Sequence, residues 1–322
     1  MIMNALLHGP WRMINRKIVA SPAAARRLLR DATVVFLYHE VSDQPSLFNQ
    51  LLDLNVPPAI FDQQLDLMSE FFHFIDPGQL LCGDYPRPAA LITFDDGNQG
   101  YVRHALPILK AKRIPSVCFL NMGPIQGETC WSGLLAYLRY GQSERTERNG
   151  HGEQPLSQTT ESQVEQMLAC RDREALFERV RIFRGPLMTE ADLQAIAQEP
   201  LVSLGSHLYN HHNAALLPPE RLCQEHWKNQ RLLDAHPRGT RLLSYPFGQP
   251  KSCYTDNTVH LLRQEGVSAF FSAYPLPNFT SSGPVFHRVP MSASVRTVQG
   301  LYEVMLCNYL RARMRLAPVR IS

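Results

Sequence analysis

Two adjacent carboxylates and two nearby histidines could together bind a metal ion. Asp95 and Asp96 directly follow an apolar, β-branched segment, and His207 ends a second such segment. Two neighbouring like charges repel each other unless a cation or a shared proton relieves them. His207 and His211 are four residues apart, so both rings can turn toward one point on a helical or tight-turn backbone. Because neutral imidazole and carboxylate form a common Zn²⁺ ligand set, these residues predict a divalent-metal site.

The predicted ligand set also indicates the kind of reaction. Three protein ligands leave one coordination position for water, which the metal acidifies and a further carboxylate can deprotonate. This arrangement is typical of a hydrolase.

The elements around these residues alternate between strand and helix. Residues 33–41, 90–94 and 115–122 have the composition of buried strands, and residues 100–111 carry apolar side chains at helical intervals. Such units imply a parallel sheet. The same alternation returns in the segments 202–207, 218–235, 242–247, 256–265 and 268–274. Polar residues at the carboxyl ends of parallel strands face the crevice where α/β folds bind ligands, so we expect the acidic and histidine residues to meet there.

Residues 125–200 interrupt the alternation. They contain an apolar helix near 131–140, a polar stretch and two further helical patterns, of which the second opens with Thr189 and Asp192 in capping-box spacing. We interpret this region as an insertion covering one side of a barrel. The predicted organisation is a basic N-terminal extension, a catalytic domain with that insertion, and a basic C-terminal segment, over residues 1–32, 33–300 and 301–322.

The charge is too mild for a nucleic-acid-binding protein. The net charge is +3 and no dense basic face occurs in the central stretch. Basic residues collect at the two ends, which favours contact with an anionic membrane surface or a lipid-linked saccharide, with solvated basic ends as the alternative. They are Arg12, Arg16, Lys17, Arg26, Arg27 and Arg30, and then Arg311, Arg313, Arg315 and Arg320.

The cysteine pattern predicts a reducing compartment. There are seven cysteines, an odd number, and none forms a C-x-x-C pair. No uninterrupted apolar run has signal-peptide or membrane-span length. We therefore expect a cytoplasmic protein that associates peripherally with a membrane at most.

Three motifs resemble those of the polysaccharide deacetylase family, the NodB-type carbohydrate esterases of family 4. They are TFDDG (93–97), GSHLYNHHN (205–213) and SYPFG (244–248). The flanking segments, including FLYHEVSD (36–43), are similar to the branch of poly-N-acetylglucosamine deacetylases, and the resemblance covers about residues 33–122 and 200–291. It implies an α/β fold, a distorted (β/α) barrel of the NodB type with a helical insertion.

The resemblance also implies residue roles. Asp95 would be the general base, and Asp96, His207 and His211 would hold the metal, with His212 as the alternative to His211. The backbone N–H of Phe247 would stabilise the developing oxyanion. Pro246 and Gly248 would shape that turn and, with Tyr245, contact the substrate.

Some positions depart from the family pattern. The family often has an Arg where this chain has Ser244, and we expect Arg288 to replace it as the partner of Asp95, with a surface or core Arg as the alternative. Leu208 stands where Ser or Thr is common, which removes one supporting hydrogen bond. No clear L-x-H motif occurs near the C-terminus, so the general acid is predicted to be His39, with His287 as the competitor.

The predicted function is metal-dependent removal of the N-acetyl group from an N-acetylhexosamine unit of a glycan, glycolipid or sugar precursor in surface polysaccharide, or exopolysaccharide, biosynthesis. The expected cofactor is Zn²⁺, with Co²⁺, Ni²⁺ and Mn²⁺ as alternatives. Competing interpretations are hydrolysis of another amide, a cyclic imide or an O-acetyl ester, and a non-catalytic carbohydrate-binding relative. No protein partner is predicted, and the sugar, linkage, carrier and oligomeric state stay open.

Overall fold

The computed structural model describes residues 21–141, 154–169, 172–279 and 283–313. Most of the predicted basic N-terminal extension (1–20), most of the insertion's polar stretch (142–153) and the end of the C-terminal segment (314–322) lie outside the described residues. Arg12, Arg16, Lys17, Arg315 and Arg320 belong to these parts. The predicted domain boundaries remain a prediction.

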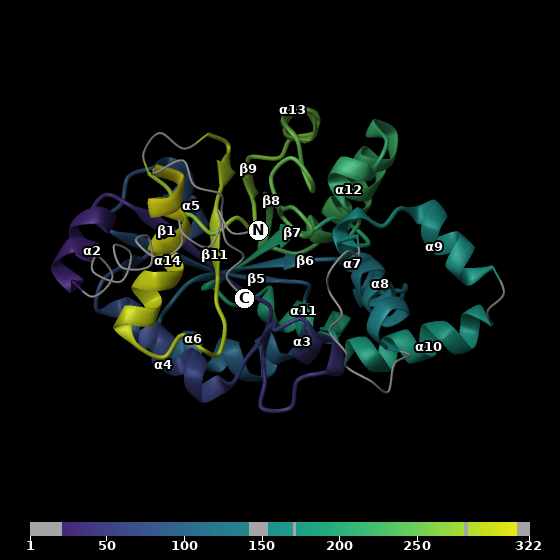
Figure 1. Ribbon diagram of the computed structural model, residues 1–322, viewed down its shortest axis with the longest axis horizontal. Helices are drawn as coiled ribbons and strands as arrows, with labels where there is room; N and C mark the ends of the chain where they lie inside the picture. Colours follow the sequence, from purple (N-terminus) through teal and green to yellow (C-terminus); the bar gives the residue numbers. More distant parts are fainter. Residues whose placement is uncertain (1–20, 142–153, 170–171, 280–282, 314–322) are drawn as a thin grey trace, which may run out of the picture.

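The centre of the fold is a nearly closed barrel of parallel strands surrounded by helices (Figure 1). The hydrogen-bonded order is β10-β9-β8-β7-β6-β5-β1-β11, and β4 also pairs with β5. The two strands at the ends of this order, β10 and β11, are separated in the chain only by His287, so the sheet curls until its ends are neighbours. The predicted distorted (β/α) barrel with helical insertion is therefore confirmed. The strands are β1 (Thr33–Tyr38), β2 (Glu40–Val41), β3 (Asn55–Val56), β4 (His73–Phe74), β5 (Ala89–Asp95), β6 (Ser116–Leu120), β7 (Val202–Ser206), β8 (Gly239–Ser244), β9 (Ala269–Phe271), β10 (Val285–Phe286) and β11 (Arg288–Pro290).

Apolar burial on both faces explains why the central strands have near-continuous apolar sequences. Every residue of β1, β5 and β6 is buried, as expected for parallel strands covered by helices. Parallel pairing with β5 on one side and β11 on the other holds β1 in the middle of this part of the sheet. Because β5, β6, β7 and β8 also pair in parallel in this order, their carboxyl ends lie at one end of the barrel.

Helices cover the outside of the barrel. In Figure 1, α12 and α13 lie near β7–β9, whereas α2, α4 and α14 lie at the other side of the barrel. The helices are α2 (Pro22–Leu29), α3 (Leu47–Leu51), α4 (Pro58–Ser69), α5 (Pro77–Cys82), α6 (Leu106–Lys112), α7 (Met122–Ile125), α8 (Trp131–Tyr140), α9 (Glu161–Leu168), α10 (Arg173–Arg184), α11 (Glu190–Ile196), α12 (Pro219–Leu233), α13 (Asp256–Gln264) and α14 (Val298–Arg313). A π-helical turn (Tyr101–Ala105) precedes α6, and short 3-10 turns cover Leu156–Gln158 and Ala214–Leu216. Among the described helices none is both long and apolar enough to cross a bilayer.

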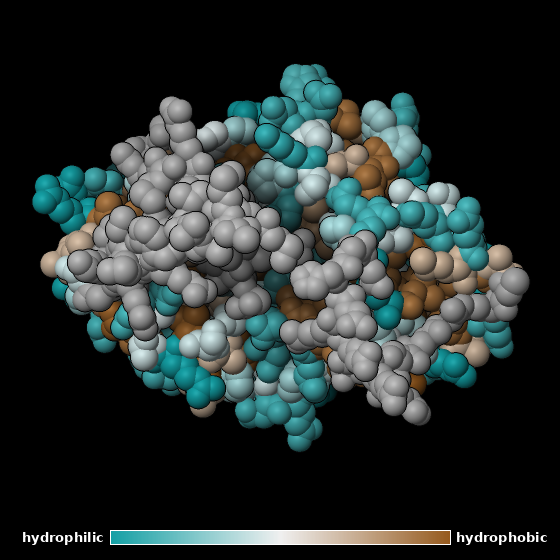
Figure 2. Space-filling view, in the orientation of Figure 1, coloured by the Kyte–Doolittle hydropathy of each residue, from teal (hydrophilic) through white to brown (hydrophobic). Residues whose placement is uncertain are grey.

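The insertion forms a small helical cluster beside the barrel. Its helices α8 and α10 pack on each other and on α3, with a shared core that includes Phe48, Leu135 and Phe183. Thr189 caps α11 through a capping box with Asp192, as its sequence predicts. The interval between α8 and α11 contains α9 and α10, one helix more than the sequence pattern indicates. Figure 2 shows hydrophobic surface beside the helices of this cluster. Met167 of α9 and Ile182 of α10 are exposed large apolar residues.

Candidate metal centre and its surroundings

Asp96, His207 and His211 come together at the carboxyl end of the barrel. Their candidate ligand atoms all lie within 4.8 Å of one another, and all three side chains are buried. Asp96 follows the last residue of β5 and His207 follows the last residue of β7. Asp96 and His211 have positive φ angles of 75° and 65°, so left-handed turns at these positions aim the two side chains at each other. The turns, rather than a helix, bring the two histidines to one point.

Unused lone pairs in this group fit a divalent cation. Oδ1 of Asp96 lies 3.3 Å from Nε2 of His211 and 3.5 Å from Nε2 of His207, yet it is buried without a hydrogen-bond partner. Nδ1 of His207 lies 2.8 Å from the carbonyl oxygen of Ser244. A carbonyl oxygen can only accept a hydrogen bond, so Nδ1 carries the proton of the neutral ring and Nε2 is unprotonated toward Asp96. Burial lowers the pKa of His207 to about 4, so this ring is neutral at physiological pH. One carboxylate and two imidazole rings are a suitable ligand set for Zn²⁺.

Arg288 forms a two-pronged pair with Asp95 beside this group. Its Nη1 and Nη2 donate to Oδ1 and Oδ2 of Asp95, both at 2.7 Å. Nε donates to the carbonyl of Ser272 at 2.8 Å, and Nη2 also donates to Oγ of Ser244 at 2.6 Å. The guanidinium is fully buried. Burial alone would raise the pKa of Asp95, but Arg288 and His207 hold this pKa below its ordinary value, so the carboxylate is ionised.

Arg288 contacts the carboxylate whose partner the sequence analysis expects it to be. Arg288 lies in the short strand β11, whereas the sequence interpretation put it after the last strand. Ser244 is small enough to leave room for the guanidinium and accepts one of its hydrogen bonds.

His39 and His287 have different surroundings. His39 follows β1, and burial lowers its pKa while the nearby charges of Asp96 and Asp95 raise it. His287 instead holds its Nδ1 2.9 Å from Oγ of Ser272 and packs against the ring of Tyr274, and burial lowers its pKa. Of the two candidate acids, His39 is therefore the one whose pKa is affected by both carboxylates of the site.

The third motif forms a strained turn over the histidines. Phe247 and Gly248 have positive φ angles of 60° and 63°, and the ring of Phe247 lies 4.8 Å from that of His211. A Cβ on Gly248 would lie 2.3 Å from the backbone nitrogen of Ala273, so only glycine fits there. The amide of Gly248 donates to the carbonyl of Pro246 at 2.7 Å, which tightens the turn.

Tyr245 does not face this turn. Its ring is fully buried and stacks on the rings of Tyr254 and Phe270. The ring therefore has no exposed surface for the substrate contact that the sequence predicts for it.

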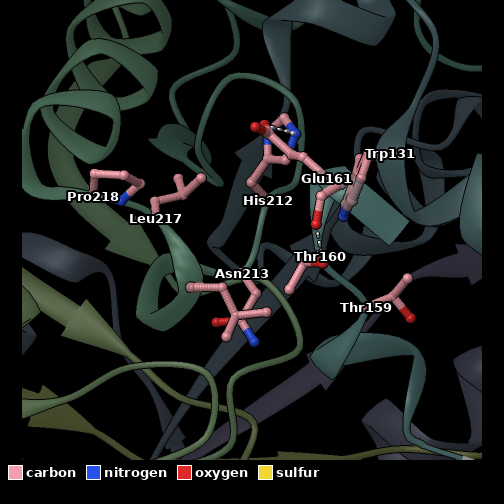
Figure 3. A pocket seen from close by; sticks show the side chains of 10 residues that line it. Trp131, Thr159, Thr160, Glu161, His212, Asn213, Leu217 and Pro218 are labelled. Atoms are coloured by element: carbon pink, nitrogen blue, oxygen red, sulfur yellow. Dashed lines mark hydrogen bonds and ion pairs between the residues drawn. The ribbon is translucent and has the colours of Figure 1, made fainter. Parts of the chain in front are cut away.

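His212 points away from Asp96. Its Nε2 lies 3.3 Å from Glu161 and its Nδ1 lies 3.4 Å from Glu225, while Trp131 packs on the ring at 4.7 Å. His212, Glu161 and Trp131 line a pocket of about 200 Å³ between the insertion and the loop after β7. Figure 3 shows the contact between His212 and Glu161. Of the two alternatives, His211 and not His212 joins the candidate metal centre.

Several residues that support the candidate metal ligands are not identified from the sequence. Asn121 donates to the backbone carbonyls of His207 and Leu208, which supports the loop where Leu208 lacks a polar side chain. Arg184 of the insertion donates to Asp96 and Asn98. Asn98 directly follows the TFDDG motif, and this adjacency is the signal that could have identified it. A single Arg within a helix rich in arginines carries no such signal.

Glu40 is a buried carboxyl next to this network. Nδ2 of Asn49 donates to it at 3.2 Å, and Gly100 leaves it room, because a Cβ there would lie 1.6 Å from Oε1 of Glu40. Burial raises the pKa of Glu40 to about 7, although Arg184 opposes this shift. The folded protein therefore holds this proton at pH values where the unfolded chain releases it.

The wild-type protein should lose free energy of unfolding as pH rises, and we expect a Glu40→Gln variant not to show this loss. A raised folded-state pKa contributes stability that is present below the unfolded value near 4.5 and lost as pH rises through about 7. The shift corresponds to about 3 kcal/mol. Denaturant unfolding at pH 4.5 and pH 8 should show the wild type losing about this amount relative to the variant. Exposed Glu303→Gln is the control, and a pH-independent difference for Glu40→Gln would contradict the expectation.

Comparisons with known proteins agree with the fold and the motifs. The family model described as polysaccharide deacetylase matches residues 83–270. A deacetylase from Streptococcus pyogenes, PplD, solved in complex with acetate, is 16% identical over 86% of this chain and 99% of its own, with a TM-score of 0.59. IcaB from Ammonifex degensii is 21% identical over 84% and 97% of the two chains, with a TM-score of 0.58. A de-N-acetylase from Aggregatibacter actinomycetemcomitans is 16% identical over 85% and 100%, with a TM-score of 0.55. A search of the curated proteins finds no match.

The fold and this end of the barrel define an α/β-barrel protein of the NodB type. Because the family model covers more than half of the 322 residues, the chain belongs to the polysaccharide deacetylase family, as its motifs predict.

Proposed function

We propose that this protein is a metal-dependent hydrolase that removes the N-acetyl group from an N-acetylhexosamine unit of a surface glycan or its precursor. Membership of the polysaccharide deacetylase family supports a hydrolytic deacetylase acting on carbohydrate. The observation that carries the finer proposal is the ionised Asp95–Arg288 pair directly beside Asp96, His207 and His211. Asp95 thus has a fixed orientation next to the three candidate metal ligands.

The proposed mechanism assigns each residue one task. Asp96, His207 and His211 would hold a divalent ion, with Zn²⁺ as the expected metal. When bound, such an ion acts as a Lewis acid that polarises a carbonyl and lowers the pKa of water. Asp95 would accept a proton from the water that attacks the acetamide carbon. Arg288 would keep Asp95 ionised and oriented.

The remaining tasks concern the carbonyl oxygen and the leaving nitrogen. The amide of Phe247 would donate to the oxygen as negative charge develops on it. Breaking the C–N bond requires a proton on nitrogen, and His39 would supply it. The products are acetate and the free amine of the sugar.

The similar structures support this substrate class. One is named a de-N-acetylase, one is IcaB, and one is a deacetylase solved with acetate. We propose on this basis that the substrate is an N-acetylated glycan of the poly-N-acetylglucosamine kind. A cytoplasmic location, contact with lipid-linked saccharide and a role in exopolysaccharide biosynthesis remain predictions that rest on the cysteines and the basic chain ends.

Product analysis tests the proposed function. The purified protein, loaded with Zn²⁺ or Co²⁺, is incubated with chitooligosaccharides and, in parallel, with an O-acetylated sugar. We expect equal amounts of acetate and new primary amine from the first substrate. Treatment with dipicolinate should abolish both products, and added metal should restore them. Acetate from the ester alone would show an esterase, and turnover that is independent of metal would contradict the mechanism.

A further inference from the structure

Arg184 is a buried arginine that the insertion places next to the candidate metal centre. It is the last residue of α10 and its side chain is 3% exposed. The guanidinium stacks on the ring of Phe48 at 4.5 Å. Gly133 of α8 makes room for the stem, because a Cβ there would lie 3.3 Å from Cδ of Arg184. Phe48 of α3 and the close approach of α8 therefore hold this side chain in one place.

The two carboxylate oxygens of Asp96 have different environments. Nη2 of Arg184 donates to Oδ2 of Asp96 at 3.2 Å. Oδ1 of Asp96, without a hydrogen bond, faces the Nε2 atoms of His207 and His211. One oxygen of Asp96 is thus occupied by Arg184 and the other is directed at the histidines.

The second prong of Arg184 reaches the backbone of His39 through one more residue. Nη1 of Arg184 donates to Oδ1 of Asn98 at 2.6 Å. Nδ2 of Asn98 in turn donates to the carbonyl oxygen of His39 at 3.1 Å. A planar guanidinium can hold two acceptors in a fixed geometry, whereas an ammonium acts as a point charge. One residue of the insertion therefore connects Asp96 with the segment that carries His39.

We propose that Arg184 is a positioning residue that restricts Asp96 to binding a metal through Oδ1 alone. With Oδ2 held by Arg184, Asp96 offers one ligand atom instead of two, which leaves coordination positions for water and substrate. A buried guanidinium is costly unless it is paired, so its placement here needs the partners described above. This inference rests on the proposed metal site and assigns the insertion a direct part in it.

Replacing Arg184 by Met tests this inference, because Met keeps an apolar stem and removes the charge and both donors. With Oδ2 released, Asp96 can bind through both oxygens. Visible absorption of Co²⁺ weakens as its coordination number rises, since geometry determines the spectrum. We expect the Co²⁺-loaded variant to absorb less per bound ion than wild type. We also expect kcat to fall about tenfold, the usual effect of removing a residue that orients a metal ligand, with KM little changed.

Two further variants make the result interpretable. Arg181→Met is the matched control, because Arg181 lies on the same helix, is 75% exposed and pairs with Glu178. It should leave the spectrum and kcat unchanged. Arg184→Lys keeps the charge but cannot hold Asp96 and Asn98 together. Its Co²⁺ absorption and its kcat should therefore both fall, but by less than in Arg184→Met. The Lys variant also replaces the Met variant if that one does not fold.

The outcomes separate this inference from the proposed function. If wild-type protein binds no Co²⁺, the proposed metal site itself fails. If wild type binds Co²⁺ and the folded Arg184 variants share its spectrum and kcat, the metal site stands and the role of Arg184 is overturned. A loss of thermal stability alone, with unchanged spectrum and kcat, would show that Arg184 only supports the fold.

Discussion

An Asp95→Asn variant is expected to lose about 10²- to 10⁴-fold in kcat, the range for removing a general base. Asn is similar in size and shape to Asp, so it fits the space between β5 and Arg288, but it cannot accept a proton. Asp95 is 3% exposed and both its oxygens accept from Arg288, so no other carboxylate can enter its position without moving the arginine. Acetate release from a chitooligosaccharide at saturating concentration measures the effect.

Metal binding should survive this change, because Asp95 is not one of the three grouped side chains. Oδ2 of Asp95 lies 3.7 Å from Nε2 of His207, and the group itself contains Asp96. The variant should therefore still bind Zn²⁺ or Co²⁺ when titrated. Asp62→Asn is the control, since Asp62 is about half exposed and pairs with Lys112 on the surface. A fully active Asp95→Asn protein would rule out Asp95 as the base.

The central strands and the candidate metal centre could be predicted because their signals are local. A parallel strand buried on both faces gives an apolar run such as ALITF, and a polar residue after that run must lie at its carboxyl end. Asp96 and His207 follow two such strands, so their proximity follows from the alignment of parallel strands. By contrast, β4 and β10 have two residues each, too few for any periodicity.

The surroundings of the site depend on contacts between distant segments and could not be predicted. Arg181 and Arg184 belong to one amphipathic helix, and only the packing of that helix on Phe48 and Gly133 distinguishes the exposed arginine from the buried one. Tyr245 follows a strand, as Asp96 does. Its burial comes from Tyr254, which lies beyond the turn, and from Phe270 on the neighbouring strand β9. Position at a strand end therefore identifies a candidate site residue, but the side chains packed around that residue determine whether it is exposed.

Of the variants described here, Arg288→Met should show the largest decrease in the free energy of unfolding. The change leaves the carboxylate of Asp95 buried without its partner, and breaking a buried pair from one side costs about 3–5 kcal/mol. The hydrogen bonds to Ser272 and Ser244 are lost as well. Denaturant unfolding at pH 7 measures the cost. Arg241→Met is the matched control, because Arg241 pairs with Asp234 at 2.8 Å on the surface, where about 1 kcal/mol or less is expected.

A double-mutant cycle separates the pair from the simple loss of a large side chain. In Asp95→Asn combined with Arg288→Met neither charge remains, so the double variant should be more stable than the sum of the single costs predicts. The coupling should be at least about 1 kcal/mol, since contacting residues in one network couple by about 0.5–3 kcal/mol. Additive costs would mean that Asp95 and Arg288 act independently, and Arg288 would then lose its assigned role of orienting the base. If the two substitutions couple in stability and Asp95→Asn is also inactive, Asp95 acts as the base while Arg288 orients it, as their two 2.7 Å contacts indicate.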